Sequence, residues 1–325
     1  MRVLVTGGAG YIGSHVCKAL TAAGMEPVTL DNLSQGTAKA VKWGRLIEGD
    51  VADTDLVAES LRQSEAEAVM HFASSASVAE SVQDPAAYYR NNVSGTLSLL
   101  DAMRRTGVRR IVFSSTSAIY GETRRLPIPE EAAAAPLSPY ARSKLMVEAI
   151  LADEAAAHGL AYLALRYFNA AGADPEGETG DQRRTATHLI PMAFKALAGE
   201  TECLEVFGDD YPTPDGTCIR DYVHVSDLAQ GHLLALDHLM RDGQSTVLNL
   251  GAGRGVSVLE AIASIERVTG RKVPSVRRPR RPGDAPALYA DPSAARRLLG
   301  FSTKLSDMDT IVGTAWQFYR KVRGL

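Results

Sequence analysis

The sequence predicts an α/β fold, in which a Rossmann-type doubly wound parallel sheet is joined to a smaller, interleaved domain. A strand, a glycine-rich turn and a helix open the chain, strand and helix patterns then alternate to residue 168, and the pattern becomes loop-rich from residue 169. The 325 residues are enough for two domains. We expect residues 1–168 plus 222–250 to form the first domain and residues 169–221 plus 251–325 the second.

The glycine-rich turn has the spacing Gly7-x-x-Gly10-x-x-Gly13, between an apolar run at residues 1–6 and a helical pattern at residues 14–20. Gly7 permits the tight turn, Gly10 lets the backbone approach a pyrophosphate, and Gly13 lets the helix lie close to the strand. The helix N-terminus offers unpaired N–H groups and partial positive charge to that anion. The turn predicts dinucleotide binding, although glycines at this spacing also occur in structural turns.

The next strand pattern, at residues 27–31, ends in Asp31, roughly 20 residues after the turn. A carboxylate there accepts a hydrogen bond from the ribose 2′-OH of a dinucleotide and repels a 2′-phosphate. No Arg or Lys follows before Lys39. The pattern favours NAD over NADP, and it also weakens the alternative that Asp31 only caps a loop.

Repeated strand and helix patterns predict βαβ units and therefore a parallel sheet with helices on both faces. Further strands are predicted at residues 45–50, 68–73, 110–115 and 161–167, and helices at 52–63, 92–106 and 139–158. Ligands bind outside the carboxyl ends of such strands. The residues at these ends are Asp50, Phe72, Ala73, Ser114, Ser115, Thr116, Tyr167, Phe168 and Asn169.

The second half of the chain has weaker patterns. Helices are predicted at residues 188–199 and 225–240, a candidate last strand of the sheet at 246–250, and loops at 170–184 and 209–221. Residues 271–281 are strongly basic and interrupted by proline. This run is either a solvated loop or the source of two arginines that clamp a phosphate.

Tyr140 and Lys144 lie four residues apart in the predicted helix at residues 139–158, and therefore on one helix face. An ammonium near a phenol stabilises the phenolate and lowers the tyrosine pKa, which makes Tyr140 a candidate general base. Thr116 is placed at a strand end to hold the same substrate hydroxyl. Tyr and Lys at this spacing are common on helix surfaces, so the prediction depends on the glycine turn and on Asp31.

The composition is ordinary for a globular protein, with 45% hydrophobic and 22% charged residues and a net charge of -3. This balance does not indicate nucleic acid or an anionic membrane as a partner, and no apolar run reaches membrane-spanning length. Because the first strand starts at Met1, we expect no signal peptide. Cys17, Cys203 and Cys218 are too few and too far apart for a disulfide framework or a zinc site. We expect a cytoplasmic protein without a bound metal.

The chain resembles the nucleotide-sugar epimerases of the extended short-chain dehydrogenase/reductase family over nearly its whole length. The glycine turn and the Tyr/Lys pair are shared by the superfamily, whereas later motifs are specific to the epimerases. These later motifs are Arg166-Tyr167-Phe168-Asn169, His188-Leu189-Ile190-Pro191, Asp209-Asp210-Tyr211-Pro212-Thr213, Arg220-Asp221-Tyr222-Val223-His224 and Arg281-Pro282-Gly283-Asp284.

The resemblance implies reversible epimerisation at C4 of a UDP-hexose, between UDP-glucose and UDP-galactose, through a 4-keto intermediate with tightly bound NAD. It implies that Tyr140 is the base, that Lys144 tunes it, and that Thr116 is the catalytic hydroxyl. The implied NAD contacts are Gly7, Gly10, Tyr11, Ile12, Gly13, Asp31, Asn32, Asp50, Val51, Phe72, Ala73, Asn92, Ser114, Tyr140, Lys144 and Tyr167. The implied UDP-sugar contacts are Thr116, Tyr140, Asn169, His188, Leu189, Phe207, Arg220, Arg281 and Asp284. The first domain would then bind NAD and the second the UDP-sugar, and the helices after Asn92 and Tyr140 would pair in a homodimer.

Several alternatives stay open. The 4-epimerases of UDP-GlcNAc, UDP-xylose and UDP-glucuronate share these motifs, and Ala76 stands where many family members have a lysine near the nicotinamide. Sugar 4,6-dehydratases start with the same oxidation but usually carry an Asp-Glu pair after the catalytic threonine, where this chain has Ser117 and Ala118. A non-catalytic NAD-binding regulator would typically lack Tyr140 or Lys144.

Overall fold

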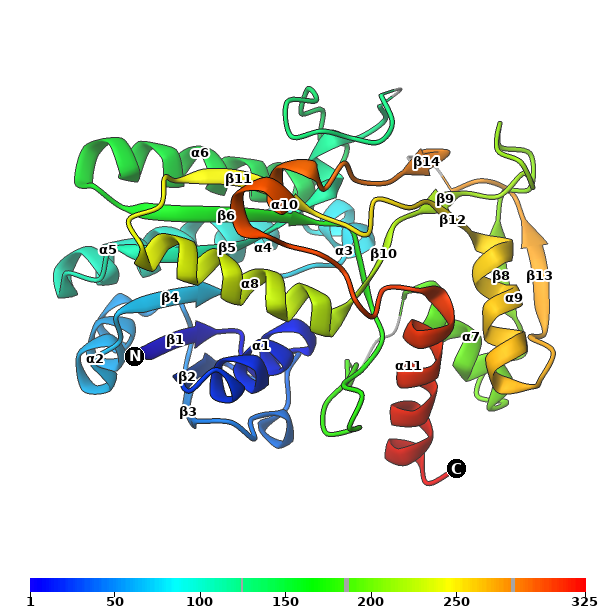
Figure 1. Ribbon diagram of the computed structural model, residues 1–325, viewed down its shortest axis with the longest axis horizontal. Coiled ribbons are helices and arrows are strands. Elements are labelled where there is room, and N and C mark those ends of the chain that lie inside the picture. Colours follow the sequence, from blue (N-terminus) through cyan, green and yellow to red (C-terminus); the bar gives the residue numbers. More distant parts are fainter. Residues whose placement is uncertain (124, 184–186, 282–283) are drawn as a thin grey trace.

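A seven-stranded sheet forms the centre of the molecule (Figure 1). The computed structural model describes residues 1–123, 125–183, 187–281 and 284–325. The sheet order is β11-β6-β5-β4-β1-β2-β3, and all its pairings are parallel. Its strands are β1 (Arg2–Thr6), β2 (Glu26–Asp31), β3 (Arg45–Glu48), β4 (Ala68–His71), β5 (Arg110–Thr116), β6 (Ala161–Tyr167) and β11 (Thr246–Leu250). The predicted fold class is confirmed, and the order reverses between β1 and β4, where doubly wound sheets bind ligands.

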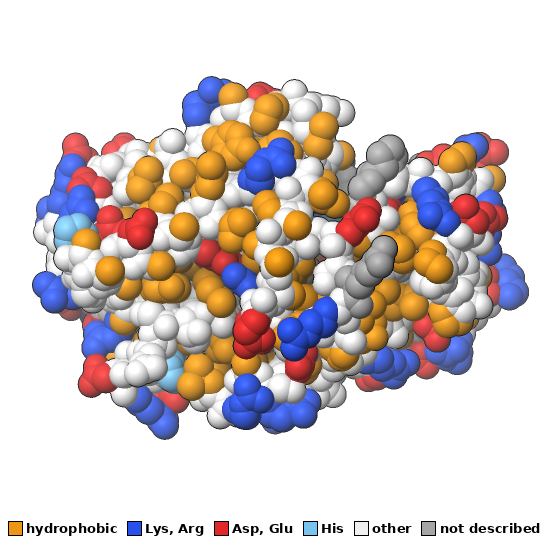
Figure 2. Space-filling view, turned by 90° about the horizontal axis from the view of Figure 1, so that it is seen from above, with side chains coloured by type: hydrophobic (Ala, Val, Ile, Leu, Met, Phe, Trp, Pro, Cys, Tyr) orange, Lys and Arg blue, Asp and Glu red, His pale blue; other side chains and the backbone are white. Residues whose placement is uncertain are grey.

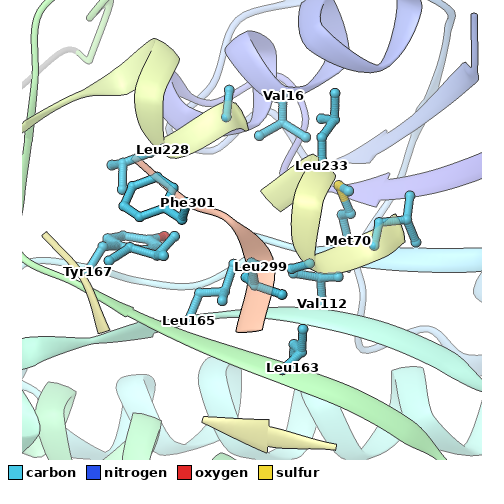
Figure 3. Close-up of a cluster of buried hydrophobic side chains, with 14 of the residues drawn as sticks. Val16, Met70, Val112, Leu163, Leu165, Tyr167, Leu228, Leu233, Leu299 and Phe301 are labelled. Atoms are coloured by element: carbon cyan, nitrogen blue, oxygen red, sulfur yellow. The ribbon is translucent and has the colours of Figure 1, made fainter. Parts of the chain in front are cut away.

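Helices cover both faces of this sheet (Figure 1). The helices α1 (Tyr11–Ala22) and α8 (Val225–Met240) lie on one face, and α2 (Thr54–Ser64), α5 (Gly95–Thr106) and α6 (Pro139–His158) on the other. Side chains alternate along a strand, so Val3 and Val5 belong to the first core and Leu4 to the second. Figure 3 shows the first core, where side chains from α1, α8 and the sheet meet Phe301.

A third core lies outside the large sheet, among short strands and three helices. The strand pairs are β7 (Asn169–Ala171) with β10 (Tyr222–His224) and β8 (Leu204–Phe207) with β13 (Ser275–Arg278), and β12 (Val256–Ser257), β9 (Ile219–Arg220) and β14 (Ala287–Leu288) form a three-stranded sheet. The helices are α7 (Leu189–Leu197), α9 (Val258–Thr269) and α11 (Met308–Arg323). The short helices α3 (Val78–Gln83), α4 (Pro85–Tyr88) and α10 (Ser293–Leu299) complete the fold, and α10 packs on α8 and β11.

Several predicted bounds differ from the structure. The helix expected from residue 92 begins as a π-helical segment, Tyr89–Ser94, before α5, and the strand expected to reach residue 50 ends as β3 at Glu48. The segments predicted as loops contain β7 and β9, and the basic run contains β13, which pairs in parallel with β8. These strands are short, so their pairing partners rather than their own sequence define them. Residue 184 of the first loop and residues 282–283 of the last motif lie outside the described residues.

None of the described helices combines the length and the apolar character needed to cross a bilayer. On the face seen in Figure 2, acidic and basic side chains are interspersed, and both signs gather at the two ends of the molecule.

Candidate active site

The glycine turn after β1 is packed too closely for side chains. Gly7 has a φ of 75°, and a Cβ atom on it would lie 2.6 Å from the backbone N of Ala73. A Cβ on Gly13 would lie 2.3 Å from the carbonyl oxygen of Gly7. Among the described atoms, a Cβ on Gly10 would meet only the Gly7 oxygen within 4 Å, at 3.2 Å. The turn therefore leaves open space beside Gly10, at the N-terminus of α1, and this shape fits a dinucleotide pyrophosphate.

The buried carboxylate of Asp31 lies directly beside this turn. It accepts hydrogen bonds from the backbone N–H groups of Ala9 (3.0 Å) and Leu33 (2.8 Å). Burial raises the pKa of Asp31, and the two N–H groups oppose that shift. The next residue, Asn32, donates from Nδ2 to Asp50 Oδ2 at 2.9 Å. Asp31 therefore orders the loop after β2 and ties it to the glycine turn.

Helix α6 carries Tyr140 and Lys144 to the carboxyl end of β5. Its start is fixed by Ser138, whose hydroxyl accepts from the N–H of Ala141 (3.2 Å), and by a proline in the first turn. Lys144 is only 2% exposed, and its Nζ donates to Ser74 Oγ and to the carbonyl oxygen of Ser114, both at 2.8 Å. Lys144 therefore joins α6 to β5 and to the segment after β4.

The pKa values around Tyr140 differ from the expectation. Burial raises the pKa of Tyr140, and the Thr116 hydroxyl opposes this, whereas Lys144 directs its hydrogen bonds elsewhere. Burial lowers the pKa of Lys144 to about 7, and the charge of Glu148 opposes that shift. Without cofactor or substrate, the phenol of Tyr140 is therefore neutral, and the pKa of Lys144 lies close to neutral pH.

The strand ends place further predicted residues beside this pair. The β5–β6 register sets Thr116 opposite Tyr167, whose hydroxyl is hydrogen-bonded to Ser114 Oγ. The π-helical segment presents Asn92, which donates to Ser143 Oγ (2.9 Å) and to the carbonyl oxygen of Ser75 (3.1 Å). Asn92 therefore fixes the segment that presents Ser74 to Lys144.

A separate pocket of about 630 Å³ contains the remaining substrate candidates. Seven of them line it: Asn169, His188, Leu189, Phe207, Arg220, Arg281 and Asp284. Asp284 lies 3.4 Å from the guanidinium of Arg220 and 3.9 Å from that of Arg281. The Arg281 guanidinium also lies 4.0 Å from the ring centroid of Phe207. Two guanidinium groups that converge on one carboxylate are suited to binding a pyrophosphate. Arg281 also covers one face of the Phe207 ring, so only the other face of this ring is free of that contact.

Sequence reasoning missed three residues beside this site. These residues are Ser74, Glu148 and Arg166. The Ser74 hydroxyl accepts a hydrogen bond from Lys144, and Glu148, one helical turn after Lys144, forms a buried ion pair with Arg166. The spacing of Tyr140, Lys144 and Glu148 at every fourth residue of one helix was the available signal. Nothing local in the sequence marks Ser74, because its partner is 70 residues away.

One group of described acidic side chains has the spacing of metal ligands. It consists of Asp174, Glu176 and Glu178, in the loop after β7. The Nζ of Lys18 on α1 lies 2.8, 2.6 and 2.7 Å from the three carboxylates. The single ammonium of Lys18 therefore offsets part of this negative charge and ties the loop to α1.

The fold and the site define a dinucleotide-binding protein of the doubly wound α/β class, with a tyrosine–lysine pair at the carboxyl end of β5. Residues 3–251 match the NAD dependent epimerase/dehydratase family, and the chain belongs to this family. The family and the cofactor predicted from the sequence are thereby confirmed.

Relatives match the chain over almost its full length. It is 51% identical over 322 residues to the UDP-glucose 4-epimerase of Azospirillum brasilense, covering 99% of this chain and 92% of that protein. The UDP-glucose 4-epimerase of Brucella ovis in complex with NAD is 56% identical, with a TM-score of 0.95 and 98% of both chains covered. A UDP-glucose 4-epimerase from Stenotrophomonas maltophila, with bound NAD and formylated UDP-arabinopyranose, is 40% identical, with a TM-score of 0.97, covering 100% of this chain and 99% of that one.

Proposed function

We propose that this chain catalyses the reversible epimerisation of a UDP-hexose at C4, interconverting UDP-glucose and UDP-galactose, with NAD held tightly. The observation that carries the proposal is the convergence of Tyr140, Lys144 and Thr116 at the carboxyl end of β5, in a chain that also has a pocket with two arginines. The names of the relatives support the same activity, because two of them are UDP-glucose 4-epimerases at more than 50% identity.

The catalytic roles follow from where the groups lie. NAD, when bound, supplies a hydride acceptor that can return the hydride to the other face of C4. Tyr140 removes the proton of the 4-hydroxyl, and Thr116 holds that hydroxyl from the end of β5. Lys144, fixed by Ser74 and Ser114, supplies the positive charge that a tyrosinate needs in a buried site. Residues 1–168 plus 222–250 carry these groups and the NAD contacts.

The substrate is held by its nucleotide end in the second part of the chain, residues 169–221 plus 251–325. Arg220 and Arg281, which lie near the Asp284 carboxylate, bind the pyrophosphate when the substrate is present. A guanidinium can pair bidentately with phosphate oxygens. Asn169, His188 and Leu189 line the same pocket. The sugar, which must present both faces of C4 to one hydride site, is held more loosely than the nucleotide.

We also propose that the protein works in the cytoplasm as a homodimer. Cys17 and Cys218 are buried free thiols, which suits a reducing compartment. Leu97 of α5 and Met146 of α6 are 45% and 49% exposed, and apolar side chains on neighbouring helices suit a helix-to-helix interface. The subunit mass by sedimentation tests this assembly.

The identity of the sugar separates the main proposal from its alternatives. The Stenotrophomonas relative holds a UDP-pentose derivative, so 4-epimerases of UDP-GlcNAc, UDP-xylose and UDP-glucuronate stay as second candidates. Incubation of the purified protein with UDP-galactose should yield UDP-glucose, measured by chromatography. A parallel panel of the other three UDP-sugars ranks them by kcat/KM. If none of the sugars is converted, the protein is not an epimerase and the alternative of an NAD-binding regulator is favoured.

Tyr140→Phe removes only the proton acceptor, so kcat should fall by roughly 10²–10⁴-fold while UDP binding persists. Tyr162→Phe is the matched control. Tyr162 lies at the start of β6, away from the carboxyl ends of the strands, so this change should leave kcat unchanged. Turnover of Tyr140→Phe within a few-fold of wild type would refute the assignment of the base.

A further inference from the structure

Glu148 stands one helical turn beyond Lys144 and takes part in a buried ion pair. Its carboxylate accepts from Arg166 on β6, with Nε–Oε1 and Nη2–Oε2 distances of 3.0 and 2.6 Å, and from the hydroxyl of Ser115 on β5. Glu148 is 6% exposed and Arg166 8%. Buried ion pairs add little to stability compared with apolar replacements, so this pair invites a functional explanation.

Lys144 is buried where its charge needs a partner. Its two hydrogen-bond acceptors, Ser74 Oγ and the Ser114 carbonyl, are neutral, and the Phe113 ring lies 4.8 Å from its Nζ. The titratable and charged side chains around it, from α6, β4 and β6, are His71, Tyr140, Glu148, Arg166 and Tyr167.

Among these five side chains, Glu148 alone supplies negative charge. Burial lowers the pKa of His71 to about 3, assisted by the charge of Lys144, so the imidazole is neutral. Burial raises the pKa values of Tyr140 and Tyr167, so both phenols are neutral before catalysis. Arg166 is a cation. Glu148, at helical i,i+4 spacing from Lys144, is therefore the one carboxylate of the five, and its charge opposes the effect of burial on Lys144.

We propose that Glu148 is a positioning residue that keeps Lys144 in its protonated form, and that Arg166 and Ser115 hold the Glu148 carboxylate in place for this purpose. The inference rests on the proposed function for its catalytic consequence, since a neutral Lys144 cannot support the tyrosinate at position 140. Burial lowers the pKa of Lys144 to about 7 and the charge of Glu148 opposes that shift, so loss of this charge should lower the pKa further and leave more of the amine neutral at pH 7.

The test is a direct titration of Lys144 in the purified protein with its cofactor retained. Protein labelled with ¹³C at the lysine ε-carbon is titrated by NMR, and Lys144→Met assigns the resonance. In Glu148→Gln the midpoint should move to lower pH by on the order of 1 unit, because a carboxylate at this spacing is lost. The alkaline limb of the pH–kcat profile should move in the same direction, and Glu148→Asp should restore part of both shifts.

Glu154→Gln, on the same helix, removes a surface carboxylate that pairs with Arg104 at 3.5 Å, and it should leave the Lys144 titration unchanged. If Glu148→Gln fails to fold, the double variant Glu148→Gln/Arg166→Gln leaves no unpaired buried charge. It should shift the midpoint in the same direction by a smaller amount. An unchanged Lys144 midpoint in either folded variant would overturn the proposal. A wild-type protein that titrates as expected but converts no UDP-sugar would refute the proposed function and leave this inference standing.

Discussion

Alanine at Gly10 and alanine at Gly13 should fail for different reasons, although both glycines belong to one motif. A Cβ on Gly13 would lie 2.3 Å from the Gly7 carbonyl oxygen and 2.8 Å from Gly8 Cα, both of them backbone atoms. Among the described residues, a Cβ on Gly10 would meet only the Gly7 oxygen within 4 Å, at 3.2 Å. The φ of Gly10 is -83°, which alanine adopts without strain. Gly13→Ala should therefore damage the protein itself, whereas Gly10→Ala should damage only the dinucleotide site.

The magnitudes follow from these distances. Ordinary contacts begin near 3.4 Å, so the N-terminus of α1 must move by about 1 Å to admit alanine at position 13. Overpacking of this kind costs about 1–3 kcal/mol, and the better helix propensity of alanine returns roughly 1 kcal/mol. At position 10 the methyl group enters the space for the pyrophosphate instead. A clash of about 1–3 kcal/mol there corresponds to roughly 5- to 150-fold weaker NAD binding.

The assay separates the two effects. NAD released by denaturation is quantified per chain, and thermal unfolding is compared after NAD has been stripped from every variant, because bound ligand raises Tm. We expect Gly10→Ala to lose NAD with an unchanged Tm, and Gly13→Ala to lose both. Thr21→Ala, at an exposed position of α1, is the control for alanine in this helix. Retention of NAD at the wild-type level by Gly10→Ala would refute the placement of the pyrophosphate.

Three further predictions concern single side chains. Asp31→Asn should weaken NAD retention by about 1.5–3 kcal/mol, the range of charge-assisted hydrogen bonds, and NAD content equal to wild type would contradict it. Arg281→Ala should weaken UDP and UDP-glucose by a similar factor with less effect on kcat, as calorimetry and kinetics can measure; unchanged UDP affinity would mean that the nucleotide lies elsewhere. Burial raises the pKa of Asp221 to about 6, against opposing N–H groups of Ala290, Ala252 and Gly253. Because this folded-state pKa exceeds the unfolded value of about 3.9, ionisation costs stability, and the free energy of unfolding should fall by roughly 2 kcal/mol between pH 4 and 7. Asp221→Asn should lack this slope in urea unfolding, and equal slopes would contradict the prediction.

Helices whose first and last residues are marked by capping residues were predictable from the sequence. Helix α6 runs over the predicted residues because Ser138 caps it, Pro139 opens it, and Gly159 ends it with a φ of 69°. The sequence also indicated the group of pocket residues around Arg220 and Arg281, but only through resemblance.

Features that depend on distant contacts were not predictable. The strand pair β8–β13 is defined by partners some 70 residues apart, and neither strand has a clear period of its own. The ammonium of Lys144 was expected to act on Tyr140 directly, whereas its hydrogen bonds go to Ser74 and Ser114. Helical spacing places two side chains on one face but does not say which neighbour from another strand comes closer.

Under the proposed function, one part of the chain holds NAD and the other holds the UDP-sugar, and this explains why the nucleotide is easier to infer than the sugar. Arg220 and Arg281 would meet the pyrophosphate that every UDP-sugar carries, and their charges are visible in the sequence. Tyr140 and Thr116 would meet only the hydroxyl that all 4-epimerases oxidise. An intermediate that must turn over between two hydride transfers leaves few fixed contacts to its other hydroxyls. Selectivity among UDP-sugars would then depend on the shape of the space around the ring, which is set by side chains without distinctive chemistry.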